Sequence, residues 1–212
     1  MKYNLEIRAI ARQEQSIEDK HQSFLGALDG LPTPWGLVQP VPAPDPGSGL
    51  SASLKVAKLL GKGLRGDLVY QFRRPFRDEA SQDDYINVTF DPERIDYKQL
   101  VANIFLRYVS AFGGYYADIS DDEFIFMDYD KRRELRIDKR HNIYRISPVS
   151  YLSKELCLKA LGLTPDQVVE RLQGKVEAVR TALDGVLIVL TSKALPTAEM
   201  DEICWKVRNH FN

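Results

Sequence analysis

Acidic side chains are concentrated in residues 116–130, which contain no basic residue. Several carboxylates placed close together can hold a divalent metal ion, and such an ion can activate water for hydrolysis. This segment also lacks histidine and does not match the spacing of a known metal-binding loop. Because crowded carboxylates can still bind a metal ion, a metal-dependent hydrolase that uses the carboxylates of residues 118–130 is kept as the alternative hypothesis for the function. The acids concerned are Asp118, Asp121, Asp122, Glu123, Asp128 and Asp130.

No other pattern predicts catalysis. A nucleophilic site needs a serine or cysteine, a histidine and an orienting acid. The sequence contains no G-x-S-x-G motif, and Cys157 and Cys204 fall on predicted apolar helix faces, as buried thiols do. His21, His141 and His210 are scattered, and none has a second ligand at metal-binding spacing. We therefore expect no catalytic residues, no metal, no cofactor and no enzymatic activity.

Residues 61–66 read Gly-Lys-Gly-Leu-Arg-Gly, which is formally a G-x-G-x-x-G motif. In dinucleotide-binding proteins this motif follows a strand and opens a helix. Here it is expected after a short helix, suggested by Leu54, Ala57, Lys58 and Leu60, and before a strand. We interpret the glycines as a flexible turn, and a small-ligand module built on this turn is a second alternative.

The acidic segment is followed by a block of seven bases in residues 131–145. Adjacent blocks of opposite sign can neutralise each other across a helix or hairpin. Alternatively, the acids and the aromatic residues among them, which include Phe124, Phe126 and Tyr129, form a face that recognises a basic partner. The candidate partner-binding residues are Tyr115, Tyr116, Asp118, Asp121, Asp122, Glu123 and Asp128, with Trp35 as either a core plug or an exposed anchor.

The length and amino-acid composition are those of an ordinary globular protein: the chain has 212 residues and a formal net charge of −1. This balance does not favour direct binding of nucleic acid, which usually requires a basic surplus. No run approaches the roughly 20 apolar residues of a membrane helix, and charged residues follow Met1 closely. We expect a cytoplasmic protein without membrane contact.

The elements that must position these residues follow from hydrophobic periodicity. We predict strands at 3–10, 68–72, 85–90 and 142–147, a charged and exposed connection from Arg73 to Asp84, and a surface loop at 31–49, where six prolines occur. Helices are expected after Ser16, after Asp96 as far as Phe112, and in residues 156–161.

The final third of the chain is built around an unbroken apolar run at 186–191, which predicts a strand buried on both faces. A helix capped by Thr197 should pack on its sheet, and Thr164 should cap an earlier helix. Residues 175–183 fit either a helix or a strand with a hairpin turn at Asp184-Gly185, with a slight preference for the strand. Together these elements predict a single α+β domain over 1–212, with a mixed, mostly antiparallel sheet and helices packed against it.

The order and spacing of several segments are similar to those of immunity protein family fifty-two of bacterial polymorphic toxin systems. The carboxyl-terminal half carries the resemblance in residues 146–152, 156–157, 161–165 and 183–187. The first strand, residues 11–14, the following helix and the Trp35-Gly36 loop are also compatible with it.

This resemblance implies a cytoplasmic α+β protein that binds and neutralises a cognate effector toxin in a stoichiometric complex. The expected toxin is a restriction-endonuclease-like nuclease, often delivered by a type VI secretion system. An acidic face would suit the basic groove of such an enzyme. The resemblance leaves open whether inhibition is by active-site occlusion or allosteric, and it supplies no catalytic residues.

Overall fold

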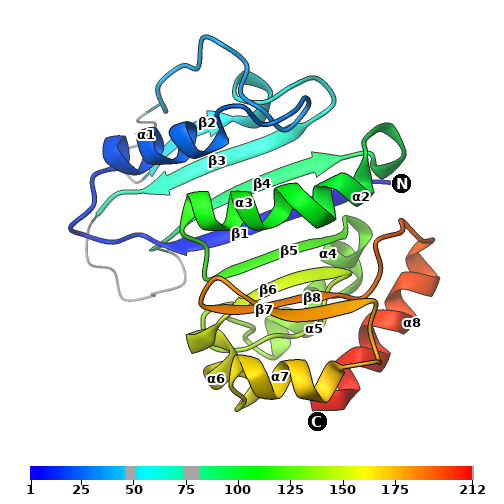
Figure 1. Cartoon of the computed structure of the whole chain (residues 1–212). Coiled ribbons are helices and arrows are strands. Elements are labelled where there is room, and N and C mark those ends of the chain that lie inside the picture. Colours follow the sequence, from blue (N-terminus) through cyan, green and yellow to red (C-terminus); the bar gives the residue numbers. More distant parts are fainter. Residues whose placement is uncertain (46–50, 74–81, 212) are drawn as a thin grey trace.

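The computed structural model describes residues 1–45, 51–73 and 82–211. These residues form an eight-stranded sheet with the order β2-β3-β4-β1-β5-β6-β8-β7 (Figure 1). Every pairing between neighbouring strands is antiparallel, so the predicted α+β class with a mostly antiparallel sheet is confirmed. The strands are β1 (Tyr3–Ile10), β2 (Ser51–Lys55), β3 (Arg65–Gln71), β4 (Asp83–Phe90), β5 (Tyr116–Asp121), β6 (Val149–Ser153), β7 (Ala178–Ala182) and β8 (Gly185–Val189).

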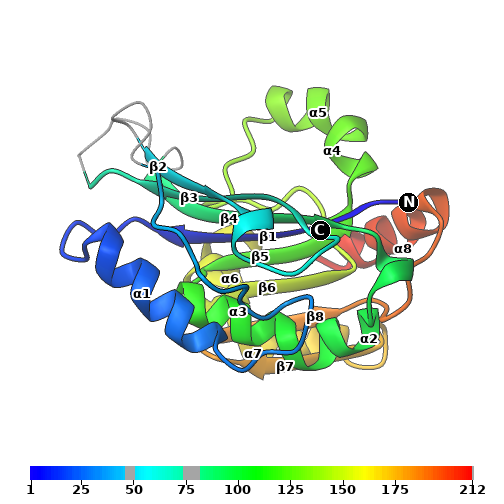
Figure 2. The same cartoon turned by 90° about the horizontal axis from the view of Figure 1, so that it is seen from above.

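The helices occupy both sides of the sheet. The α-helices are α1 (Ile17–Leu28), α2 (Tyr97–Gln99), α3 (Phe105–Phe112), α4 (Glu123–Met127), α5 (Tyr129–Glu134), α6 (Lys154–Leu161), α7 (Pro165–Leu172) and α8 (Thr197–Arg208). Shorter helical turns are Val56–Lys58, Pro92–Arg94, Leu100–Ile104 and Asn209–Phe211. Figure 2 shows α1 and α3 on one side of the sheet, while α4 and α5 stand away from the other. Among the described residues, no helix has the length and apolar character to cross a membrane.

The alternation along β1 gives the sheet two chemically different faces. Tyr3, Leu5 and Ile7 are fully buried on the face that α1 and α3 cover. Asn4 and Glu6 point to the opposite face. There the residues paired with them on β4 and β5 are also polar: Asn87, Thr89, Asp118 and Ser120. The apolar face builds the core, and the polar face supports the candidate site.

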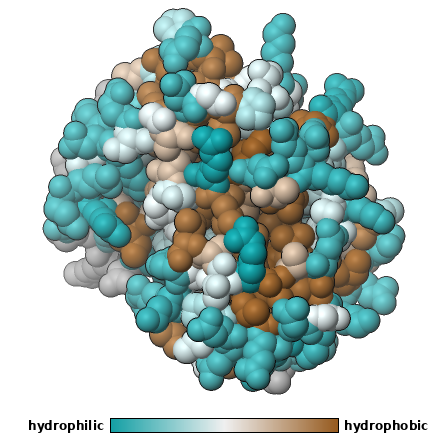
Figure 3. Space-filling model, viewed as in Figure 1, coloured by the Kyte–Doolittle hydropathy of each residue, from teal (hydrophilic) through white to brown (hydrophobic). Residues whose placement is uncertain are grey.

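Figure 3 views the α1–α3 side, on which hydrophobic residues reach the surface between α3 and α7.

The helix starts read from the sequence are largely confirmed. Ser16 accepts a hydrogen bond from the Asp19 N–H, and Thr164 and Gln167 form the expected capping box. The helix expected over residues 97–112 is present, with a π-helical turn at Leu100–Ile104 between α2 and α3. Residues 178–182 form a strand that pairs with β8, as the preferred of the two alternatives predicted.

Several element predictions are wrong. Residues 142–147 are not a strand; the strand lies just after Pro148, as β6, and Tyr116–Asp121 forms the unpredicted β5. The short helix suggested by Leu54, Ala57, Lys58 and Leu60 is present only as the turn Val56–Lys58, and Leu54 belongs to β2, whose alternate side chains are buried. Thr197 is the first residue of α8 and not its cap; its hydroxyl donates to Asp121 Oδ2 instead.

The connection expected to be exposed between Arg73 and Asp84 contains two buried carboxylates. Asp83 and Asp84 open β4 and are 1% and 0% exposed. Asp84 binds Lys20 Nζ at 2.8 Å and the Arg73 guanidinium at 2.7 Å. Buried carboxylates need such partners, so these residues fasten α1 to the sheet. Residues 74–81 lie outside the described part of the chain, as do residues 46–50 of the proline-rich loop.

Close approach of β6 and β8 requires glycine at the start of β8. A Cβ added to Gly185 would lie 2.0 Å from Leu152 O, whereas a Cβ added to Gly26 in α1 meets nothing within 4 Å. We expect Gly185→Ala to lower the free energy of unfolding by about 2 kcal/mol or more. Gly26→Ala should raise it by about 0.5–1 kcal/mol, because alanine favours the helix. Urea denaturation measures both, and an unchanged Gly185→Ala protein would contradict the β6–β8 register.

Candidate protein-interaction site

Helices α4 and α5 form a projection that carries an unusual concentration of exposed apolar side chains. We call residues 123–135 the α4–α5 projection; Figure 2 shows it standing clear of the sheet. Among the described residues, ten large hydrophobic side chains are exposed, and five of them lie here. The five are Ile125 (41% exposed), Phe126 (78%), Met127 (54%), Tyr129 (58%) and Leu135 (49%). Such concentrations on one surface element mark interaction sites.

The two helices of the projection bury only one side chain between them. Within α4 only Phe124 is buried, and α5 buries no residue. Helices of five and six residues are not stable by themselves in water. Their conformation must therefore be fixed by contacts at the base of the projection.

Arg145 provides the main contact at that base. Its Nε and Nη2 atoms donate to the two carboxylate oxygens of Asp128 at 2.7 and 2.6 Å, and Nη1 donates to Asp201 of α8. The guanidinium carbon lies 4.0 Å from the centre of the Phe124 ring and 4.9 Å from that of Trp205. A two-pronged pair of this kind is geometrically specific and strong. It ties the junction of α4 and α5 to α8.

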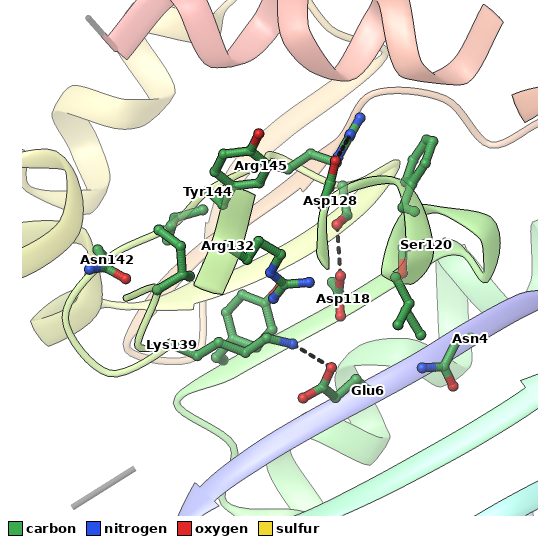
Figure 4. Close-up of a pocket in the computed structure, with 16 residues that line it drawn as sticks. Asn4, Glu6, Asp118, Ser120, Asp128, Arg132, Lys139, Asn142, Tyr144 and Arg145 are labelled. Carbon is green, nitrogen blue, oxygen red and sulfur yellow. Dashed lines mark hydrogen bonds and ion pairs between the residues drawn. The ribbon is translucent and has the colours of Figure 1, made fainter. Parts of the chain in front are cut away.

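A polar pocket lies between the projection and the polar face of the sheet (Figure 4). Glu6 of β1 and Asp118 of β5 are directly opposite each other in the strand register. Lys139 donates to Glu6, and Ser147 Oγ donates to Asp118 Oδ2 at 2.7 Å. Its cavity volume is about 40 Å³, which is enough for a few waters.

The two carboxyl groups of this pocket have pKa values displaced in opposite directions. Burial raises the pKa of Glu6, but the charges of Lys139 and Arg8 outweigh it and bring the pKa down to about 2. Burial raises the pKa of Asp118, and repulsion by Glu6 adds to this against the opposing effects of Lys139 and Ser147. Paired carboxyl groups with separated pKa values occur in active sites. Here the small volume leaves them a structural role, which is to hold residues 139 and 147 on the sheet.

The predicted partner-binding residues are mostly not at the surface. Tyr115 and Asp122 are half-buried and Glu123 is exposed. The expectation of a continuous acidic face is therefore wrong. The buried members are Trp35 (2% exposed), Tyr116 (7%), Asp118 (5%), Asp121 (1%) and Asp128 (5%).

Each buried member has a structural partner that explains its position. Trp35 packs edge-on against Phe90 and Tyr108 in the core, so of the two alternatives for this residue the core plug is correct and the exposed anchor is wrong. Asp121 accepts from Thr197 Oγ1 at 2.6 Å, and Asp128 is held by Arg145. In the described part of the chain, no three His, Cys, Asp or Glu side chains come together in a group able to hold a metal ion.

The aromatic residues of the predicted face, like its acids, are divided between the surface and the interior: Tyr116 is buried and Tyr115 is half-buried. Phe126 and Tyr129 are exposed on the projection, although Phe124 is not. The burial of Asp118 could have been predicted from the alternation in β5, where Ala117 and Ile119 share one face and Asp118 lies on the other. That period of two identifies a strand, which directs Asp118 under the projection rather than toward solvent.

Comparison of the chain with protein-family models, with curated proteins and with solved structures finds no match. The case for this site therefore depends on its geometry, exposure and charge alone.

Removal of the Glu6 charge should destabilise the protein in a pH-dependent way. Because the pKa of Glu6 is lowered from 4.5 to about 2 on folding, the stabilisation is present above pH 4.5 and is lost as the pH falls toward 2. At pH 7 we expect Glu6→Gln to lower the free energy of unfolding by about 2–3 kcal/mol, because Lys139 is left without its carboxylate. The difference from the unaltered protein should close between pH 4.5 and pH 2.

The matched control is Glu134→Gln, which removes an exposed pair with Lys131. It should change the free energy of unfolding by less than about 0.5 kcal/mol at either pH. Urea denaturation at pH 7, 5 and 3 measures both variants. If Glu6→Gln and Glu134→Gln changed the free energy of unfolding equally at pH 7, the Glu6–Lys139 pair would not support the fold.

Proposed function

We propose that this protein acts by binding another protein through the α4–α5 projection, as an immunity protein that neutralises a cognate effector toxin in a stoichiometric complex. The observation that carries the proposal is the group of exposed apolar side chains from Ile125 to Leu135 on an anchored projection. The resemblance of the carboxyl-terminal half to a family of bacterial immunity proteins supports the choice of partner. The toxin in this proposal is a nuclease, and the complex forms in the cytoplasm.

The projection has the physical properties of a binding hot spot. Burial of apolar surface contributes roughly 25 cal/mol for each Å² removed from water, and large aromatic side chains dominate interface energetics. Phe126 and Tyr129 are the aromatic residues available for this. Because Arg145 and Phe124 already fix the base, binding loses little conformational entropy.

The charge beside this apolar group indicates the kind of surface that it fits. The exposed bases Lys131, Arg133 and Arg136 stand beside exposed acids, and Lys131 pairs with one of them; the acids are Glu123, Asp130 and Glu134. We therefore infer a partner surface with an apolar hollow and a polar rim that carries charges of both signs.

A metal-dependent hydrolase that uses residues 118–130 is the alternative function, and no observation favours it. Asp118 accepts from Ser147, Asp121 from Thr197, and Asp128 pairs with Arg145. These carboxylates satisfy three separate structural contacts.

The proposal predicts that Phe126→Asp strongly weakens partner binding without affecting the fold. Phe126 is 78% exposed, so the free energy of unfolding should change by no more than about 0.5 kcal/mol. Affinity for the partner should fall about 30-fold or more, as for loss of an interface hot spot. The matched control is Leu158→Asp on α6, outside the projection, where the side chain is 46% exposed.

The experiment begins with tagged protein expressed in its own cell, followed by identification of a co-purifying protein and reconstitution at one-to-one stoichiometry. Calorimetry measures its affinity for the unaltered protein and both variants, and an activity assay of the partner measures neutralisation. Loss of both with Phe126→Asp alone supports the proposal. Retained binding by Phe126→Asp, or a partner whose activity is unaffected, contradicts it.

A further inference from the structure

A second hollow, separate from the α4–α5 projection, lies at the end of the sheet where β3 begins and β4 ends. Figure 1 shows both strand ends next to the amino terminus. The hollow has a volume of about 590 Å³, within the range of sites for small molecules. We call it the basic pocket, because four of its five ionisable lining residues are Lys2, Lys62, Arg65 and Arg94, and the fifth is Asp91.

The four bases come from separate parts of the chain. Lys2 precedes β1, Lys62 lies in the turn before β3, Arg65 begins β3, and Arg94 ends the helical turn after β4. Gly63 adopts a left-handed conformation (φ +95°) in that turn, which brings Lys62 and Arg65 to the same hollow. Convergence of like charges from distant segments is unfavourable unless an anion binds between them.

The charges in the pocket are largely uncompensated within the described part of the chain. The side chains of Lys2, Lys62 and Arg65 make no ion pair or hydrogen bond there. Arg94 reaches Asp91 at 3.3 Å, but its side chain is 84% exposed, so this pair contributes little. Thr89 pairs with Arg65 across the strands and also lines the pocket, so its hydroxyl is a further hydrogen-bond donor there.

We propose that the basic pocket binds a small oligophosphate, that is, a molecule with two or more linked phosphate groups. Guanidinium groups match phosphate oxygens in pairs, lysines add point charges, and four bases against one acid suit a ligand with several negative charges. The recognition depends on side-chain charge and not on the dinucleotide-binding use of G-x-G-x-x-G, because residues 61–66 open a strand and not a helix. This inference is independent of the proposed protein partner.

The test is calorimetry of the full chain with inorganic tripolyphosphate and, separately, with ATP. We expect saturable one-to-one binding that weakens as salt is added, since the contacts are exposed. Lys62→Gln combined with Arg65→Gln should lower the affinity about tenfold or more while leaving the melting temperature of the free protein unchanged. Tighter binding of ATP identifies a nucleotide ligand, and equal binding identifies the phosphate chain alone.

The control is Arg171→Gln combined with Lys175→Gln, which removes the same charges from an exposed surface near the end of α7. Equal weakening by the two double variants would reduce the effect to general charge attraction and overturn the proposal. So would the absence of saturable binding, or citrate binding as tightly as tripolyphosphate. A single-stranded oligonucleotide whose affinity exceeds that of ATP and rises with length would replace the small ligand with nucleic acid.

Discussion

The position of the exposed α4–α5 projection depends on the contact of Arg145 with Asp128 and Asp201. The guanidinium lies over the rings of Phe124 and Trp205 and bonds to one carboxylate at the α4–α5 junction and to another on α8. Without it, the junction of α4 and α5 would lose its main link to the rest of the molecule. Two helical segments too short to be stable alone are thereby held in one position. A fixed apolar projection follows from a buried ion pair, because the geometry of a bidentate pair is narrow.

Buried charges on the polar face of the sheet are likewise balanced by neighbouring charges of opposite sign. Glu6 remains ionised because Lys139 and Arg8 compensate its burial, and this raises the cost of a second charge on Asp118 opposite it. Such a pair stabilises the fold only while all its partners stay in place. The loop that carries Lys139 and Ser147 is therefore fixed to the sheet at the point where the projection departs from it. Residues 137–147 need no regular secondary structure to hold this position.

Sequence patterns were sufficient for elements whose signal is local. Caps at Ser16 and Thr164, the alternation of β1 and the apolar run of β8 all depend on neighbouring residues, and each was predicted. The order of the strands and the burial of Asp83, Asp84 and Asp118 were not predicted. These depend on partners distant in the sequence, such as Ser147, 29 positions from Asp118, and Lys20, 64 positions from Asp84. A run of acids looks the same in sequence whether each carboxylate meets water or a distant base.

This distinction changes what the net charge of −1 says about binding. Asp83, Asp84, Asp121 and Asp128 are all at most 5% exposed, so these negative charges contribute little to the surface that a partner meets. The bases around the basic pocket remain exposed, and Lys2, Lys62 and Arg65 make no ion pair within the described residues. A chain that is slightly acidic in total therefore presents one basic hollow, while its apolar projection carries exposed charges of both signs. The projection suits a protein surface and the hollow suits a compact anion, because apolar area and enclosed volume select different ligands.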